Sequence, residues 1–344
     1  MFPFIAPPCP AFTPGTQVDL PMLVVDLERR DSRRGEFTTL TLAHRSERIS
    51  TSPFWPEDRF RLAGIARGQA VRVRGEVGQF NGRRQLKVAT LEALGPGQVD
   101  LRELLPSIAS TVPFWRALDR WRQAIRGPQL SRTVALFFDD TAFRSRFESC
   151  PASVGGHHAE LGGLLRHTWE VAAIGRAIAR TCAADLDLVL AGAMLHDIGK
   201  LEAYRWEGAF EMTDAGALLG HVTLGMLMLD RRLSAQPAPP CTDGERLLLQ
   251  HLIASHHGHQ EFGAAMPPMT LEAEVLHYAD NASAKATSMA KVLVTDENFE
   301  AEALLSARPL WEIDKRRAYR GRSDWEGSAG TRKDPGQVPT RAGG

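Results

Sequence analysis

Cysteine is scarce in this sequence, and its spacing limits the kinds of site that the chain can form. There are 4 cysteines among 344 residues, namely Cys9, Cys150, Cys182 and Cys241. They are far apart and form no CxxC pair, so neither a thiolate metal motif nor a disulfide framework is indicated. We expect reduced thiols in a cytoplasmic protein.

Long apolar runs are also missing. No run approaches the roughly 18 residues that a membrane-spanning helix requires, so we expect no membrane association. The first ten residues, MFPFIAPPCP, lack a basic region and are interrupted by prolines, which is unlike a signal peptide. Hydrophobic residues make up 43% and charged residues 24%, which is typical of a soluble globular protein. A chain of this length favours two domains over one.

Neither sign of charge is in excess overall, but the two signs are unevenly distributed. The formal net charge is +0. Residues 17–95 carry 14 Lys+Arg against 10 Asp+Glu, residues 157–295 carry 10 against 16, and residues 315–344 carry 8 against 3. A cation site needs surplus carboxylates and a polyanion-binding surface needs surplus cations. The distribution is compatible with both, in different regions, and also with ordinary surface variation.

Residues 17–95 have the short alternating pattern of β-strands. The pattern predicts strands at 20–27, 37–42, 48–51, 69–77 and 83–93, a helix at 57–67 and a hairpin turn at Asn81-Gly82. Five short strands with one helix before the fourth are typical of a small Greek-key β-barrel, the OB-fold. Such barrels bind single strands through a basic groove and aromatic side chains. The candidate nucleic-acid contacts are Trp55, Phe60, Phe80, Arg83 and Arg84, of which Trp55 and Phe60 are equally compatible with the core.

Helical periodicity replaces the strand pattern after the linker signal Gly95-Pro96-Gly97. The fold class that we expect is therefore multidomain α+β, with a small barrel followed by an all-α helical bundle. We expect an irregular arm at 1–16, the barrel at 17–95, a helical connector at 96–154 that packs on the second domain, that domain at 155–310, and a basic, disordered tail at 311–344. The tail contains the basic run Lys315-Arg316-Arg317 with Arg320 and Arg322, which either contacts phosphate or is simply solvated.

The second domain is predicted to contain five helices, at 158–182, 186–198, 214–231, 243–257 and 271–293. Asp185 is a candidate N-cap and Gly199 a candidate left-handed residue after the end of the second helix. Thr242 and Glu245 have the spacing of a capping box, and Gly258 is expected to close that helix.

Histidine and aspartate recur at the ends or on the apolar faces of all five predicted helices. The stretch LHDIGK, 195–200, places a His and an Asp directly after a buried apolar run, where both are costly unless something satisfies them. A single such pair could be a hydrogen-bonded core His beside an Asp. Helical bundles that project His and carboxylate inward often bind metal, and this donor set without cysteine suits Mn²⁺, Fe²⁺, Mg²⁺ or Zn²⁺. The full set is His167, His196, Asp197, His221, His256, His257 and Asp280.

The order and context of these residues resemble a known family. The sequence His, His-Asp, His, His-His, Asp resembles the HD-domain metal-dependent phosphohydrolases. The segments HHAELGGLLRHT, LAGAMLHDIGK, LLGH, ASHHG and PMTLEAEVLHYADNASAK, together with the barrel before them, resemble the YhaM family of 3′-to-5′ exoribonucleases. The resemblance covers residues 17 to about 295.

The resemblance implies a two-metal site. His167, His196, Asp197 and Asp280 would bind one metal, and Asp197 would bridge to a second that His221, His256 and His257 hold. The family's phosphate-contacting Lys corresponds to Lys200, and His158, Asn281 and Lys285 would line the substrate path. Some relatives bind a third metal through a Glu one turn before the first His, where this chain has Gly163. The family often has an aromatic residue at the position of Glu160, so stacking of a nucleotide there is in doubt.

The resemblance also implies the reaction, the cofactor and the partner. We expect single-stranded RNA to be hydrolysed to nucleoside 5′-monophosphates by a hydroxide activated between two divalent ions. Asp197 and Lys200 would be the catalytic residues, the latter by neutralising charge on the phosphoryl oxygens. Mn²⁺ is the expected metal, with Mg²⁺, Fe²⁺, Co²⁺ and Zn²⁺ as alternatives.

Several alternatives stay open at this point. The domain could instead be a phosphodiesterase for a small or cyclic nucleotide, or a structural domain in a nucleic-acid-binding protein. Single-stranded DNA as a partner, a homo-oligomer, and the choice between His256 and His257 as the tighter ligand are also open.

Overall fold

The computed structural model describes residues 12–33, 35–45, 47–80, 83–95, 97–295, 298–300 and 303–321. By its internal contacts the chain divides into two units, Met1–Ser107 with Trp206–Glu211, and Ile108–Arg205 with Met212–Gly344. Each unit is described separately. The expected Asn81-Gly82 turn, Cys9 and Arg322 lie outside the described residues.

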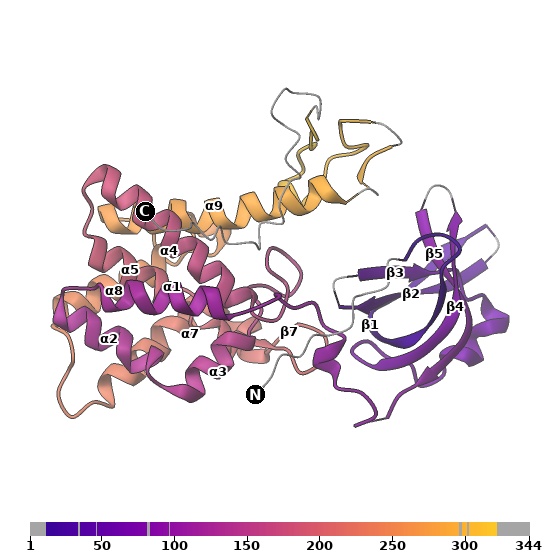
Figure 1. Ribbon diagram of the computed structural model, residues 1–344, viewed down its shortest axis with the longest axis horizontal. Coiled ribbons are helices and arrows are strands. Elements are labelled where there is room, and N and C mark those ends of the chain that lie inside the picture. Colours follow the sequence, from indigo (N-terminus) through magenta and orange to yellow (C-terminus); the bar gives the residue numbers. More distant parts are fainter. Residues whose placement is uncertain are drawn as a thin grey trace. The chain divides into compact units, whose positions relative to one another are not determined.

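The first unit is built on a closed five-stranded barrel (Figure 1). Its strands are β1 (Gln17–Ser32), β2 (Gly35–His44), β3 (Glu47–Thr51), β4 (Ala70–Phe80) and β5 (Arg83–Ala93). They follow the order β1-β2-β3-β5-β4, in which β1 pairs with both β2 and β4 and the β3–β5 pair is parallel. This is the expected Greek-key barrel of the OB-fold.

The barrel closes because alternate side chains on each strand are apolar. Met22, Val24, Leu40, Val73 and Leu86 are fully buried in its core. The helix expected at 57–67 is a shorter 3-10 helix, η1 (Pro56–Leu62). The sequence pattern predicted the position of this helix correctly but not its type. A Pro in the first turn is compatible with both an α-helix and a 3-10 helix.

The second unit is helical. Its helices are α1 (Val112–Gln123), α2 (Pro128–Phe138), α3 (Thr141–Ser149), α4 (Gly163–Cys182), α5 (Leu186–Leu195), α6 (Lys200–Ala203), α7 (Asp214–Ser234), α8 (Asp243–Ser255) and α9 (Leu271–Val294). Helix α5 packs against α2, α4, α8 and α9. Every residue from Leu188 to Leu195 is buried, so α5 is the central helix of this unit (Figure 1).

The connector helices α1–α3 belong to this same unit and pack through aromatic side chains. Trp115, Phe138, Phe143 and Phe147 form a cluster of ring contacts with centroids 5.4–6.1 Å apart. Strands β6 (Tyr204–Arg205) and β7 (Glu211–Met212) form a small two-stranded sheet after α6.

The caps of α5 and α8 agree with the sequence pattern, but the expected role of Gly199 is wrong. The side chain of Asp185 accepts hydrogen bonds from the backbone of Asp187 and Leu188, and the capping box of Thr242 and Glu245 is present. Gly199 has φ −65° rather than a left-handed conformation. Glycine is needed there because a Cβ atom would lie 2.0 Å from the His221 carbonyl oxygen of α7.

The end of the described chain is folded. We expected residues 311–321 to be disordered, but they include the short helix η5 (Trp311–Ile313). Ile313 and Ala318, together with the preceding Leu310, pack against the C-terminal part of α9. The rest of the expected tail lies outside the described residues.

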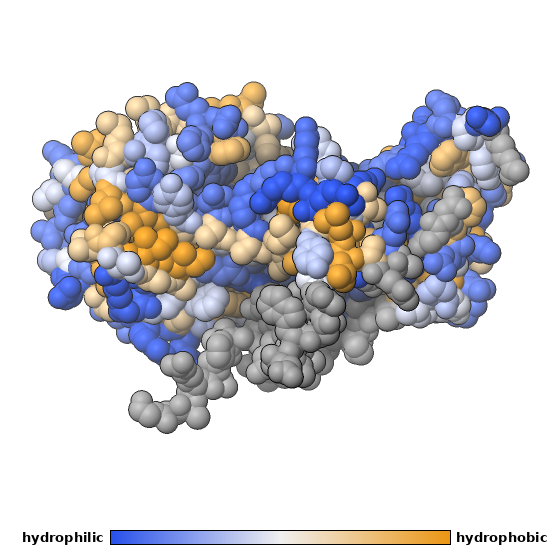
Figure 2. All heavy atoms as spheres, turned by 90° about the horizontal axis from the view of Figure 1, so that it is seen from above, coloured by the Kyte–Doolittle hydropathy of each residue, from blue (hydrophilic) through white to orange (hydrophobic). Residues whose placement is uncertain are grey.

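No helix in the described ranges is long and apolar enough to span a membrane. Figure 2 shows a mostly hydrophilic surface on the face that it presents, with apolar side chains gathered in a few patches.

Candidate metal centre

The backbone brings segments of five helices together, with His256 and His257 following directly after α8. His167 lies on the buried face of α4, and His196 and Asp197 follow directly after the last residue of α5. His221 follows a break in α7, where Gly220 has φ 72°. Asp280 lies in the middle of α9. Buried apolar faces on α4, α5 and α9 hold these elements together, so the polar side chains point into an otherwise apolar bundle.

Asp197 and three neighbours form the first group. The Nε2 atoms of His167 and His196 lie 3.3 and 3.1 Å from Oδ2 of Asp197. The Nε2 atom of His167 is also 3.0 Å from Oδ1 of Asp280. His167, His196 and Asp197 are at most 1% exposed. Their donor atoms converge closely enough to share one metal ion.

A second group lies against the other oxygen of Asp197. His221, His256 and His257 present one ligand atom each, all within 4.8 Å of one another. Oδ1 of Asp197 is 3.4 Å from Nε2 of His221 and 3.7 Å from Nε2 of His256. The Asp197 carboxylate therefore faces one group with each of its oxygens.

The protons on the imidazole rings are directed away from the centre. The Nδ1 atoms of His196, His256 and His257 lie 2.9, 2.7 and 2.7 Å from the backbone oxygens of Ala193, Ile253 and Phe262. A carbonyl can only accept, so each Nδ1 donates and each Nε2 carries the lone pair in the neutral ring. The Nε2 lone pairs therefore point into the centre, as metal ligation requires.

Burial keeps the second group neutral. It lowers the pKa of His221 to about 3 and holds the pKa of His256 well below its usual range, with additional repulsion from His257 at His256. Burial also lowers the pKa of His257. Burial alone would raise the pKa of Asp197, but His196 and Lys200 hold it well below its usual range, so the carboxylate is ionised.

The residues present fit a pair of divalent cations. Nε2 of His221, Nε2 of His256 and Oδ1 of Asp197 are buried and have no hydrogen-bond partner. Buried polar atoms are rarely left unsatisfied unless they serve a purpose such as binding an ion. Imidazoles beside carboxylates, with no thiolate among them, are the donor set of Mn²⁺, Fe²⁺ or Zn²⁺ rather than of a soft metal.

Lys200 is part of this centre. It is 5% exposed, and its Nζ lies 2.6 Å from Oδ2 of Asp197. Burial would lower its pKa, but the charge of Asp197 raises it above the usual value, so the ammonium is retained at neutral pH. Lys200 opens α6 rather than ending α5, and its burial excludes the role of a solvated charge at a helix end.

Comparison with known proteins agrees with this geometry. The model of the HD domain family matches residues 164–285. The 3′-5′ exoribonucleases YhaM of Bacillus subtilis and Bacillus velezensis are each 31% identical over 285 residues, which cover 81% of this chain and 88% of the relative. That of Oceanobacillus iheyensis is 29% identical over 288 residues, covering 82% and 88%. No solved structure gives a significant match.

The chain belongs to the YhaM family. The resemblance seen in its motifs is thereby confirmed, and so is the order of a barrel followed by a helical HD-domain region.

Behind His167 the structure places a network that the motifs of the YhaM family did not indicate. Nδ1 of His167 lies 3.0 Å from the Ser283 hydroxyl, which donates to Oε2 of Glu170 at 2.7 Å. Nε2 of His158 lies 2.9 Å from the same carboxylate oxygen. Outer partners of this kind fix the orientation of a ligating imidazole. Helical spacing could have indicated this network. Glu170 follows His167 by three residues and Ser283 follows Asp280 by three, so each lies on the same helix face as a candidate ligand.

His157 lies beside the candidate ligands as well as His158, whose ring is 6.0 Å from that of His167. The ring of His157 is 5.2 Å from that of His167, and burial together with His167 lowers its pKa to about 2. His158 is buried against Glu160 and Glu170 with a left-handed φ of 48°. Neighbouring positions in a loop cannot be told apart by pattern alone, because the turn decides which ring faces inward.

The other expected substrate contacts lie further out on α9. Asn281 is exposed, and Lys285 forms an ion pair with Asp314 at 2.5 Å. Glu160 is held by Arg166 at 3.4 Å. Gly163 admits no side chain, because a Cβ atom would lie 2.0 Å from the His158 carbonyl oxygen.

The candidate nucleic-acid contacts on the barrel are only partly exposed. Phe80 and Phe60 are 63% and 76% exposed, and Phe80 pairs across the β4–β5 hairpin with the exposed Arg83. Arg84 is half-buried and donates to the Phe12 carbonyl oxygen. Trp55 is half-buried with its ring 5.4 Å from that of Phe37. Phe60 is therefore a surface side chain rather than part of the core. Trp55 lies between the two alternatives, a core residue and an exposed nucleic-acid contact.

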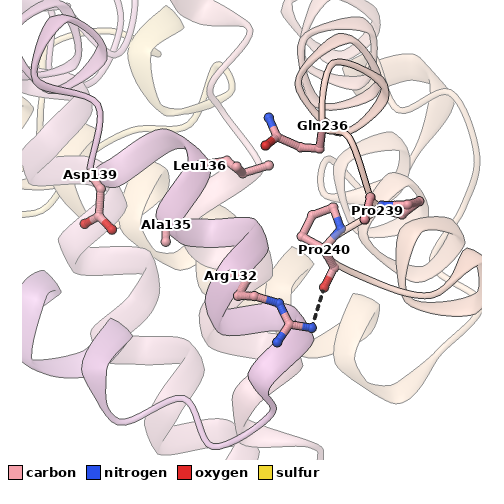
Figure 3. A pocket seen from close by; sticks show the side chains of 8 residues that line it. Arg132, Ala135, Leu136, Asp139, Gln236, Pro239 and Pro240 are labelled. Atoms are coloured by element: carbon pink, nitrogen blue, oxygen red, sulfur yellow. Dashed lines mark hydrogen bonds between the residues drawn. The ribbon is translucent and has the colours of Figure 1, made fainter.

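Two open pockets of about 580 Å³ each lie elsewhere, and no expected site residue lines either of them. Figure 3 shows the one beside α2, where Arg132 donates to the Pro240 carbonyl oxygen at 3.1 Å and Ala135 and Leu136 also line the pocket. It contains no convergent ligating groups, so we assign no chemistry to it.

Proposed function

We propose that this chain is a metal-dependent exoribonuclease that removes nucleoside 5′-monophosphates from the 3′ end of single-stranded RNA. The observation that carries the proposal is the buried Asp197 carboxylate, which faces His167 and His196 with one oxygen and His221 and His256 with the other. The names of the relatives support the direction of attack and the substrate.

The residues have defined roles in this scheme. His167, His196, Asp197 and Asp280 would hold one divalent ion, and His221, His256 and His257 would hold a second beside Asp197. When bound, such ions act as Lewis acids and allow water to ionise near neutral pH. The Lys200 ammonium, directed at the same carboxylate, is placed to neutralise negative charge on a phosphoryl oxygen.

No activated nucleophile is found among the described side chains of this centre. Cys150, which lies near Lys200 and Asp197, is fully buried, and burial raises its pKa, so it remains a neutral thiol. Hydrolysis by water in a single displacement is the chemistry that the remaining groups support.

The direct test is an assay of the purified chain on 3′-labelled and 5′-labelled single-stranded RNA, single-stranded DNA and a cyclic dinucleotide, each with Mn²⁺ or with chelator. We expect Mn²⁺-dependent release of 5′-monophosphates from the 3′ end of RNA. Hydrolysis of the cyclic dinucleotide alone would replace the proposal by a small-nucleotide phosphodiesterase. RNA binding without hydrolysis of any substrate would leave a binding protein with a structural HD domain.

We propose further that the β4–β5 hairpin of the barrel binds the RNA strand. Phe80→Ala should weaken RNA binding in chelator by about 1–3 kcal/mol through lost stacking. Arg83→Ala should reduce the slope of log K against log salt by about 1, as expected for one lost phosphate contact. Anisotropy titrations at several salt concentrations measure both quantities.

Arg72→Ala is the matched control on the barrel, because Arg72 is exposed on β4 but its guanidinium is paired with Asp19 at 2.9 Å. An equal loss in Arg72→Ala and Arg83→Ala would show that only the general positive field of the barrel attracts RNA. No loss in Phe80→Ala would mean that this hairpin is not a contact.

A further inference from the structure

The segment after α9 forms a hairpin that no part of the metal centre uses. Backbone bonds join Ser306 to Ala318 at 2.8 Å, Leu310 to Arg316 at 2.9 Å and Arg320 to Leu304 at 2.7 Å. We call residues 303–321 the terminal hairpin and residues 311–315 its tip. Figure 1 shows the terminal hairpin in yellow beyond the end of α9.

A small core fixes the terminal hairpin to the helical unit. Leu310, Ile313 and Ala318 are at most 3% exposed and pack with Val292 of α9 and with Phe299. The Ser306 side chain is fully buried; it accepts from the Ala318 amide and donates to the Arg308 carbonyl oxygen. A segment that is held in this way presents its tip in one conformation.

The terminal hairpin exposes two aromatic rings, one of them at its tip. Trp311 at the tip is 78% exposed, and Tyr319 on the returning strand is 54% exposed. Nζ of Lys315 lies 4.2 Å from the centre of the Trp311 ring. Asp314 and Lys315 have φ values of 57° and 56°, a conformation that L side chains rarely adopt and that often marks a functional turn. The backbone is thus bent to bring a cation over the face of a solvent-exposed indole.

The charges of the terminal hairpin favour an anionic ligand. Residues 303–321 contain the cations Arg308, Lys315, Arg316, Arg317 and Arg320 against Glu312 and Asp314. Asp314 is itself paired, with Lys285 at 2.5 Å and with Arg316 at 3.6 Å.

The terminal hairpin is tied to the helix that carries a ligand of the metal centre. Asp280 and Lys285 lie on the same helix five residues apart, which is about 7.5 Å along its axis. Lys285 contacts Asp314 at the tip. Lys285 shares a helix face with the exposed Asn281, four residues before it, so the tip lies on the exposed side of α9.

We propose that the tip of the terminal hairpin is a binding platform for single-stranded RNA, in which Trp311 stacks on a base and Lys315 and Arg316 contact phosphates. An exposed aromatic ring on a rigid turn with flanking cations is the usual construction of a single-strand contact, and the aromatic face accepts any base. The inference rests on the proposed function for the identity of the strand. It adds a contact on the helical unit, separate from the barrel.

The test measures binding in chelator, so that it does not depend on catalysis. A labelled single-stranded oligouridylate is titrated with the full chain and with Trp311→Ala. We expect Trp311→Ala to weaken binding about 5- to 150-fold, which corresponds to the loss of one stacked base. Trp311→Phe should restore most of the affinity. Lys315→Ala should lower the salt slope by about 1.

Leu247→Ala is the matched control, because Leu247 is a 67% exposed apolar side chain on α8 of the same unit. Its affinity should equal that of the unaltered chain. An unchanged affinity in Trp311→Ala would overturn the platform even if the chain degrades RNA. If the chain degrades no RNA but Trp311→Ala binds more weakly than Trp311→Phe, the proposed function fails and the platform stands.

Discussion

Asp197→Ala is expected to abolish hydrolysis of RNA, with a loss of about 10³-fold or more in kcat, because a bound divalent ion contributes several kcal/mol to a phosphoryl transition state. Asp197 is the one residue that lies against both groups of ligands among the residues that the structure describes. Its Oδ2 faces His167 and His196, and its Oδ1 faces His221 and His256. Substitution of any single histidine removes a ligand from one group only.

The variant must be shown to fold, because Asp197 also pairs with Lys200. Breaking a buried ion pair on one side leaves an uncompensated charge and costs about 3–5 kcal/mol. The double variant Asp197→Ala with Lys200→Met removes both charges and should fold more stably than Asp197→Ala alone. Both variants should be inactive. If only the single variant is inactive, its defect is one of folding.

Metal binding gives the second readout. Addition of Mn²⁺ should raise the Tm of the unaltered chain, by an amount that grows with RT ln(1 + [Mn²⁺]/Kd). The same addition should raise the Tm of the double variant much less, and metal analysis should find fewer than two ions per chain. Full activity of Asp197→Ala would contradict a scheme in which this carboxylate joins two metals.

The sequence predicted the fold and the ligands for physical reasons that act locally. Strand alternation in the barrel, the caps at Asp185 and Thr242, and apolar helix faces are all set by residues close together in the chain. The candidate metal ligands were recognisable because each is a polar residue in an apolar context, where it needs a partner. The structure brings the other six candidates together around Asp197.

The features that the sequence did not reveal depend on contacts between distant segments. Gly199 is required by the approach of the His221 carbonyl oxygen, which nothing near 199 in the chain indicates. The link from His167 through Ser283 to Glu170 joins α9 to α4. The terminal hairpin has no periodic pattern, because it is held by a few buried side chains and by backbone bonds across the hairpin.

Lys200→Ala should slow turnover without loss of metal, and this prediction separates assembly of the centre from stabilisation of the transition state. An ammonium cannot ligate a metal, and at 2.6 Å from Oδ2 of Asp197 it competes with a cation for that oxygen. Its removal should therefore leave metal affinity unchanged or slightly stronger. What is lost is a preorganised positive charge at the phosphoryl group, worth about 10²–10³ in kcat.

Lys200→Met is the companion variant, because it keeps the length of the buried stem and avoids the cavity that alanine leaves. Both variants should bind two ions per chain, bind RNA in chelator as well as the unaltered chain does, and show the same loss in kcat. An unchanged kcat would mean that Lys200 serves only to balance the charge of Asp197 before metal binds. If metal content falls in Lys200→Ala but not in Lys200→Met, the stem of the side chain supports the site through packing. A fall in the metal content of both variants would mean that the ammonium positions Asp197 for metal binding. The proposed role of Lys200 in charge neutralisation would then be withdrawn.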